Sequence, residues 1–204
     1  MRITIIVEGR TEKALLPHLR RYLERHLKGQ TPDLNPFPYD GRVPKGEQLR
    51  RKVRMLLAER NGPDYVIALT DVYTGTPQPD FLDAADARNK MKSWVGDEPR
   101  FHPHAAQHDF EAWLLPYWPT IQRLAGTNRG APDGAPESVN HGNPPAHRLA
   151  DLFYRAGRGK QYVKPRDAGR ILRENDLAVA VDACPELKAL VNTILTLCKC
   201  EPVP

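Results

Sequence analysis

The distribution of apolar residues along the chain predicts three strands. Arg2–Val7 (RITIIV) and Asp64–Thr70 (DYVIALT) are short, rich in β-branched residues and nearly continuous in apolar character. Runs of this kind are typical of strands in parallel sheets, which are covered on both faces. Arg100–Ala106 follows as a third extended segment.

Elsewhere, apolar residues recur at the spacing of an α-helix. We expect the first helix over about Glu12–Lys28, with Thr11 as its N-cap, and Pro17 predicts a kink or a short first segment. The proline-rich segments Thr31–Pro44 and Gly126–Pro145 are predicted to be loops. Because strands alternate with helices, the pattern predicts an α/β fold. Further helices are expected at about Gly46–Arg60, Asp80–Trp94, Asp109–Leu124, His147–Ala156, Arg166–Asn175 and Pro185–Lys199.

The composition is that of a globular protein. The chain has 204 residues, of which 40% are apolar and 27% charged, which suits one domain or one domain with an appendage. No apolar run approaches the roughly 18–20 residues that a membrane span needs. The apolar start of the chain meets a carboxylate at Glu8, which is unlike a secretory signal. The three cysteines are an odd number and indicate no disulfide framework, so we expect a cytoplasmic protein without membrane association.

The net charge of +5 is unevenly spread. Residues 1–60 carry 14 Lys and Arg against 7 Asp and Glu, residues 61–119 carry 4 against 9, and residues 120–204 carry 12 against 9. The acidic middle is either an ordinary solvated face or the place where a cation is held. In the second case the basic flanks would receive a polyanion.

Two of the predicted strands end in a carboxylate. Glu8 follows Arg2–Val7, and Asp71 follows Asp64–Thr70. The carboxyl ends of parallel strands meet at one rim of the sheet, where ligands bind. If these strands are neighbours, the two acids lie close together and repel unless they share a proton or a cation. A hard divalent cation with oxygen ligands, such as Mg²⁺, answers that need.

A third acidic group, Asp109 and Glu111, follows the third strand. In a helix these two side chains point about 200° apart, so we expect only one of them to face the rim. The alternative for all these acids is that they only cap helices and form turns.

The motifs resemble a known family. Val7–Glu12 is similar to the V-E-G-x-[TS]-E opening of Toprim domains, especially the overcoming-lysogenization-defect-type (OLD) nucleases. Over about residues 1–195 the chain resembles a bacterial Toprim-like family labelled as a domain of unknown function. The shared motifs are I-V-E-G-x-T-E at Ile6–Glu12, D-x-Y-x-G at Asp71–Gly75, R-F-x-P-x-x-x-x-H-[ED]-F-E-A at Arg100–Ala112, P-E-x-x-N at Pro136–Asn140, P-x-x-R at Pro145–Arg148 and C-P at Cys184–Pro185.

The resemblance implies a Toprim-like fold, a small, mostly parallel sheet flanked by helices. We expect this α/β core in residues 1–125, with residues 126–204 forming a loop and a helical C-terminal extension packed on it. Toprim enzymes make or cleave phosphodiester bonds with Mg²⁺, using a Glu after the first strand and an Asp-x-Asp after a later one. Glu8 and Asp71 match these positions, but Tyr73 stands in place of the second Asp.

The missing Asp leaves the resemblance one metal ligand short. Glu111 or Asp109 is expected to supply the third, and Glu12 is a further candidate, as in the nuclease subgroup. The cofactor implied is Mg²⁺ or Mn²⁺.

A basic stretch of the chain could contribute to the cleavage of phosphodiester bonds. Residues 148–173 carry 8 basic and 2 acidic residues, interleaved with Phe153, Tyr154 and Tyr162. This pattern is either a nucleic-acid surface that uses charge and stacking or a solvated helical face with a few core aromatics. A cation from this region, Lys160, Lys164 or Arg148, would stabilise the charge that develops on a phosphate. The expected nucleic-acid-binding residues are Arg148, Arg155, Arg158, Lys160, Lys164 and Arg166.

The histidines suggest a different site. His102 and His104 lie two residues apart on one face of the predicted third strand, so a zinc or manganese site there is an alternative. We expect His108 to be a supporting residue or proton shuttle beside Glu111.

The leading hypothesis is a Mg²⁺-dependent Toprim-type nuclease that acts on DNA or RNA in phage defence. One alternative is a non-catalytic Toprim module that binds nucleic acid or an ATPase partner subunit, since the second Asp is missing and the chain has no P-loop of its own. Another is a metal-dependent hydrolase of small phosphoesters. Homodimer formation is a further expectation.

Overall fold

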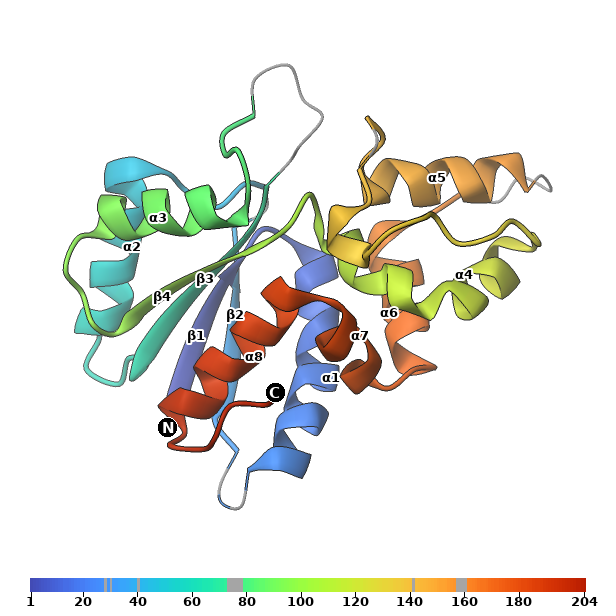
Figure 1. The fold of residues 1–204 in the computed structure, drawn as a ribbon. Coiled ribbons are helices and arrows are strands. Elements are labelled where there is room, and N and C mark those ends of the chain that lie inside the picture. Colours follow the sequence, from blue (N-terminus) through green and yellow to red (C-terminus); the bar gives the residue numbers. More distant parts are fainter. Residues whose placement is uncertain (28, 30, 40, 73–78, 141, 157–160) are drawn as a thin grey trace.

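The computed structural model describes residues 1–204 with the exception of 28, 30, 40, 73–78, 141 and 157–160 (Figure 1). Among the described residues, four strands form one parallel sheet in the order β2-β1-β3-β4. The predicted α/β fold with a small parallel sheet flanked by helices is therefore confirmed. The strands are β1 (Arg2–Val7), β2 (Asp33–Pro38), β3 (Tyr65–Asp71) and β4 (Phe101–Ala106).

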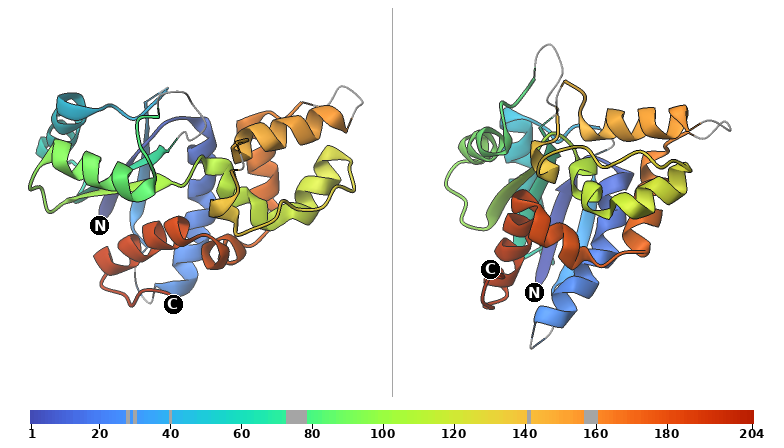
Figure 2. Two further views of the ribbon diagram at one scale, coloured as in Figure 1. Left: turned by 45° about the horizontal axis from the view of Figure 1, so that its top comes forward. Right: turned by 45° about the vertical axis from the view of Figure 1, so that its right-hand side comes forward.

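Helices cover both faces of the sheet (Figures 1 and 2). Helices α2 (Gly46–Ala58) and α3 (Ala84–Val95) pack on one face, in a core that includes Ile6 and Val66. The other face carries α1 (Arg10–His26) and α8 (Pro185–Leu197), in a core that includes Ile3 and Ile5. Burial on both sides explains why β1 is apolar at almost every position.

The rest of the chain packs beside α1, on the side away from α2 and α3 (Figure 2). Core residues of the α1 face come from both sides of residue 125, so the helical part shares a core with the sheet. The division of the chain at residue 125 stays a prediction. The elements of this region are the 3₁₀ helices η1 (Phe110–Tyr117) and η2 (Pro136–Ser138) and the helices α4 (Trp118–Ala125), α5 (Pro145–Arg155), α6 (Lys164–Arg173) and α7 (Leu177–Ala183).

Strand β2 lies inside a segment predicted to be a loop, and that prediction is wrong. The two prolines of β2 led to the wrong prediction, because proline has no N–H to donate to a neighbouring strand and so argues against a strand in the sequence. The backbone N–H of Asp33 donates to the carbonyl of Met1, just before β1, and that of Tyr39 donates to the carbonyl of Val7 in β1, at 2.9 Å each. The odd-numbered N–H groups of this edge strand therefore face β1, and Pro36 and Pro38 fall at positions that face away from it. An edge strand tolerates proline there.

Three helical predictions also differ from the structure. Helix α1 begins at Arg10 after Gly9, not at Glu12 after Thr11, and it continues through Pro17 without a break. The helix expected over Asp109–Leu124 is instead a 3₁₀ helix followed by α4. The short helix α7 was not expected at all.

No helix in the described part of the chain combines the length and the apolar character needed to cross a bilayer.

The alternation along β2 gives a test of its pairing. Asn35→Pro removes an N–H that faces β1, so we expect a loss of about 1–3 kcal/mol of unfolding free energy. Asn35→Ala keeps that N–H, and Pro36→Ala adds one that faces away from β1, so both should stay within about 0.5–1 kcal/mol of the wild type. Urea unfolding followed by circular dichroism measures the differences. Equal losses for Asn35→Pro and Asn35→Ala would contradict this pairing.

Candidate active site

The carboxylates predicted at the rim of the sheet meet there. Strands β1 and β3 are neighbours, with Val7 opposite Leu69, so Glu8 comes level with the end of β3. Glu8 Oε1 accepts a hydrogen bond from Thr70 Oγ1 at 2.5 Å and one from the backbone N–H of Asp71 at 3.2 Å. Glu8 and Asp71 are each only 5% exposed. The order of the strands thus brings both acids together at one buried point.

The end of β4 adds two more acids. Asp71 lies opposite Ala106, and the chain turns two residues later at His108, whose φ of 68° lies in the left-handed region. Asp109 then precedes η1 with extended backbone, at φ −148° and ψ 169°. Asp109 and Glu111 are both buried, and the charges of both raise the pKa of Asp71. Because Asp109 lies before η1, ideal helical geometry does not apply to it, and the expectation that only one of the two acids faces the rim stays a prediction.

Glu12 completes the acidic group from the first turn of α1. Its Oε2 accepts a hydrogen bond from the backbone N–H of Gly9 at 2.9 Å, so one of its oxygens caps the helix. Glu12 is buried, and its charge also raises the pKa of Asp71. We call Glu8, Glu12, Asp71, Asp109 and Glu111 the acidic cluster.

Burial and mutual repulsion make the cluster hard to ionise. Burial raises the pKa of Asp71 well above its usual value, and the four neighbouring carboxylates raise it further. Burial raises the pKa of Asp109 to about 6, although the Ala146 N–H opposes this, and burial with the charge of Asp109 raises that of Glu111 to about 7. A cation bound beside these groups would lower their pKa values and favour the charged forms.

Two residues from beyond α5 reach the cluster. Lys164 Nζ lies 3.3 Å from Glu111 Oε2, and the Tyr162 hydroxyl donates to Glu111 Oε1 at 3.3 Å. Burial lowers the pKa of Lys164, but the charges of Glu111, Asp71 and Asp109 outweigh it and raise that pKa overall. Lys164 is therefore a fixed positive charge beside the acids. The backbone N–H of Ala146, in the first turn of α5, donates to Asp109 Oδ2 at 3.0 Å.

The donor set fits a hard cation in its chemistry. All its atoms are carboxylate oxygens, which Mg²⁺ and Mn²⁺ prefer. Asp109 Oδ1 is buried and has no hydrogen-bond partner among the described residues, which leaves one oxygen without compensation. Within the same residues, however, no three His, Cys, Asp or Glu side chains are gathered closely enough to hold one ion. Tyr73, at the position of the second Asp, lies outside the described residues.

The basic residues predicted to bind nucleic acid are divided among three places. Lys164 lies at the acidic cluster. Arg148 and Arg155 line a cavity beside α5, and Arg166 pairs with Asp167 of its own helix at 2.8 Å. Arg158 and Lys160 lie outside the described residues.

The interleaved aromatics are not a stacking surface as a group. Phe153 is buried and packs edge-on against Tyr162 with ring centroids 5.4 Å apart. Tyr154 differs from them, since it is 77% exposed.

Among the described residues, no group of three His, Cys, Asp or Glu side chains could hold the zinc or manganese ion suggested for His102 and His104. His104 is buried on β4, its Nε2 lies 3.0 Å from Thr193 Oγ1 of α8, and burial lowers its pKa to about 3. His102 is half-buried on the same strand. Burial lowers the pKa of His108, and a hydrogen bond to the backbone of Glu137 opposes that shift.

Sequence reasoning named Lys164 as a candidate for the site but missed the other partners of the cluster. Thr70 directly precedes Asp71 and could have been suspected as a donor at the strand end. Tyr162 and Ala146 carry no signal in the sequence, because they reach Glu111 and Asp109 only through the packing of distant helices.

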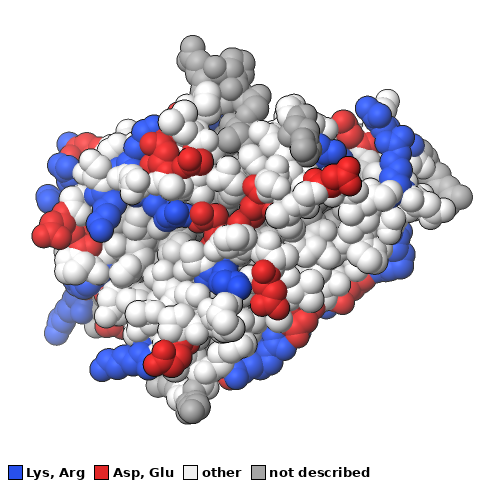
Figure 3. Space-filling model, in the orientation of Figure 1, with Lys and Arg blue, Asp and Glu red and all other residues white. Residues whose placement is uncertain are grey.

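On the face seen in Figure 1, acidic and basic side chains are interspersed, and the acidic side chains near the centre lie close to basic ones (Figure 3).

A solved structure shares this fold. The C-terminal region of the Burkholderia pseudomallei OLD protein is 14% identical, with a TM-score of 0.54 over 97% of this chain and 98% of that chain. The C-terminal region of the Xanthomonas campestris pv. campestris OLD protein is 16% identical, with a TM-score of 0.47 over 97% and 95%. No curated protein sequence matches the chain.

The sequence-based recognition of a Toprim-like fold related to OLD proteins is thus confirmed. A family model described as a domain of unknown function, DUF4276, matches residues 7–195. The chain belongs to this DUF4276 family.

Proposed function

We propose that the protein is a metal-dependent, Toprim-type nuclease that hydrolyses phosphodiester bonds of DNA or RNA. The observation that carries the proposal is the acidic cluster, five buried carboxylates at the carboxyl ends of three adjacent strands. Neighbouring buried acids raise the pKa of Asp71 and of Glu111, and shifts of this kind are typical of functional sites. The fold shared with OLD proteins supports the same proposal.

In this proposal Glu8 and Asp71 hold Mg²⁺ or Mn²⁺, and Asp109 and Glu111 supply the oxygens that a second Asp after Asp71 would have given. Glu12 is a further ligand candidate through the oxygen that does not cap α1. Bound metal would activate water and stabilise negative charge on the phosphate.

Lys164 has a separate role in the proposal. Its charged Nζ beside Glu111 is placed to stabilise the negative charge that develops on the phosphate oxygens. The same interaction lowers the repulsion among the acids in the absence of metal.

Other parts of the proposal rest on less. Work beside a separate ATPase subunit in phage defence follows from the family resemblance alone. The three free cysteines, Cys184, Cys198 and Cys200, agree with the reducing cytoplasm that we propose as its location.

A non-catalytic module is the second candidate. The observation that favours it is that no three acidic or other ligating side chains of the described residues are gathered around one point. On that view Lys164 and bound protons compensate the cluster, and divalent metals bind it weakly or not at all.

The first test is the loss of cleavage in Glu8→Gln. The amide keeps the size of the side chain but removes a charge that a metal ligand needs, so we expect at least about a 100-fold fall in rate. The assay is cleavage of labelled single- and double-stranded DNA and RNA with Mg²⁺ or Mn²⁺. Glu24→Gln, on the exposed side of α1, is the matched control and should cleave like the wild type. Equal activity of Glu8→Gln and the wild type would rule out this assignment.

A second test uses the repulsion within the cluster. Folding raises the pKa of Asp109 to about 6 and that of Glu111 to about 7. The folded protein therefore binds these protons more tightly than the unfolded chain does. The stability that they contribute is complete below about pH 4 and is lost as the pH rises through 7. Metal-free protein should therefore melt at a lower temperature at pH 8 than at pH 5, and Mn²⁺ should restore stability at pH 8.

Asp71→Asn removes one of the repelling charges. We expect it to stabilise the metal-free protein at pH 8 by about 1–3 kcal/mol and to abolish the Mn²⁺-dependent rise in melting temperature. Differential scanning calorimetry after EDTA treatment measures both effects. Asp64→Asn, on the opposite end of β3, is the control. A Mn²⁺ shift that persists in Asp71→Asn would argue that the metal binds elsewhere.

A further inference from the structure

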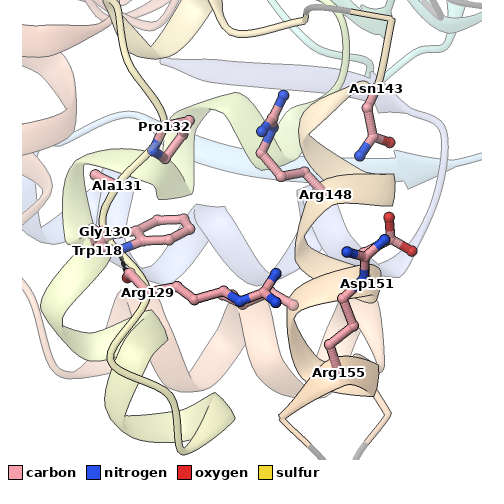
Figure 4. A pocket seen from close by; sticks show the side chains of 10 residues that line it. Trp118, Arg129, Gly130, Ala131, Pro132, Asn143, Arg148, Asp151 and Arg155 are labelled. Carbon is pink, nitrogen blue, oxygen red and sulfur yellow. Dashed lines mark hydrogen bonds between the residues drawn. The ribbon is translucent and has the colours of Figure 1, made fainter.

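A second site lies between α5 and the segment that follows α4. A cavity of about 340 Å³ opens there (Figure 4). Its volume is within the range of small-ligand sites. One wall is the face of α5 that carries Arg148, Asp151, Leu152 and Arg155, and the other walls are Trp118, Arg129–Pro132 and Asn143.

Three arginines line this cavity, and Asp151 is the one acidic residue among those that line it. In Figure 4, Arg129 extends from the segment after α4 toward α5, while Arg148 extends from α5 toward that segment. Within the described part of the chain, none of the three guanidinium groups forms an ion pair. We call this site the arginine cavity.

Arg148 gives the most direct indication that the cavity suits an anion. Its Nε is buried and has no hydrogen-bond partner among the described residues, and its Nη2 lies 3.5 Å from the carbonyl of Asn140, at the limit of a hydrogen bond. A buried guanidinium nitrogen without a partner is costly, and phosphate oxygens are acceptors that match its geometry.

The other arginines are held in place by the fold. The carbonyl of Arg129 accepts hydrogen bonds from Trp118 Nε1 at 2.9 Å and from Gln122 Nε2 at 2.8 Å. These bonds fix the backbone of Arg129 against α4. Arg148 and Arg155 lie seven residues apart on α5 and so share one face of the helix. The three charges therefore converge from two rigid elements.

Helix α5 connects the arginine cavity to the acidic cluster. Its first turn donates from Ala146 to Asp109, and Arg148 and Arg155 follow at about 3 and 14 Å along the helix axis. Phosphates of a stacked strand are spaced about 3.4 Å along its axis. A strand that ran along α5 would therefore pass Arg148 and Arg155 about one and about four nucleotides from Ala146.

We infer that the arginine cavity binds a phosphate of a single nucleic-acid strand, a few nucleotides from the acidic cluster. This inference rests on the proposed function for its choice of a strand as ligand. The volume admits one nucleotide unit and not a double helix, and the arginines contact its phosphate. Tyr154, exposed on the same helix, lies outside this cavity.

The test is fluorescence anisotropy of a labelled 20-nucleotide single strand, DNA and RNA in turn, in EDTA so that no cleavage occurs. The double variant Arg129→Ala, Arg155→Ala removes two exposed side chains and leaves the half-buried Arg148 in place, so it should fold. We expect binding about tenfold weaker or more, and a salt dependence shallower by about 0.7, which corresponds to one phosphate contact on a single strand. Arg51→Ala, at an exposed arginine of α2, is the control and should bind within about twofold of the wild type.

Two outcomes would overturn the inference. One is unchanged affinity and salt dependence in the double variant. The other is that a free nucleoside monophosphate competes for the cavity as tightly as the strand binds, which would make it a nucleotide site. Because the assay needs no metal and no cleavage, its result is separate from that of Glu8→Gln. Arginine-dependent binding without any cleavage would uphold the cavity and reject the nuclease.

Discussion

The repulsion among buried carboxylates is the constraint on which this site depends. Burial favours the uncharged form of each acid, and every neighbouring charge adds to that preference. The fold places the acids together because β1, β3 and β4 are adjacent and parallel, so whatever follows their carboxyl ends shares one rim. Lys164 and the N–H of Ala146 reduce the cost, but both act on the side of Glu111 and Asp109. On the other side of the cluster, Glu8 Oε1 accepts hydrogen bonds from Thr70 Oγ1 and from the backbone N–H of Asp71.

The candidate site is completed by residues that lie outside the sheet. Tyr162 and Lys164 come from the segment that leads into and begins α6, and Ala146 comes from α5. These contacts join the helical region to the acids at the rim, so that a change in the packing of α5 or α6 would alter the electrostatics of the cluster. The helical region is thus part of the candidate site as well as of the hydrophobic core.

What could be predicted from the sequence was local. Continuous apolar runs marked β1 and β3, and the acids that end them followed directly. The position of Asp109 was harder to predict, because it depends on the left-handed backbone conformation of His108. Residues other than glycine rarely adopt that conformation, so a histidine in the sequence does not indicate it. Lys164 and Tyr162 reach Glu111 across 53 and 51 residues, and no pattern along the chain encodes such a contact. Strand β2 was missed because its prolines are typical of loops. In an edge strand they are permitted at the positions whose N–H would face away from the neighbouring strand.

The prolines at the outward-facing positions of β2 have a consequence for assembly. An open sheet edge normally invites a strand from another molecule, and proteins block such edges in several ways. At β2 the outward positions 36 and 38 are prolines, which offer no N–H to an arriving strand. The sheet therefore resists extension across β2, both by a second copy of the chain and in aggregates. A homodimer of this protein would have to form through another surface.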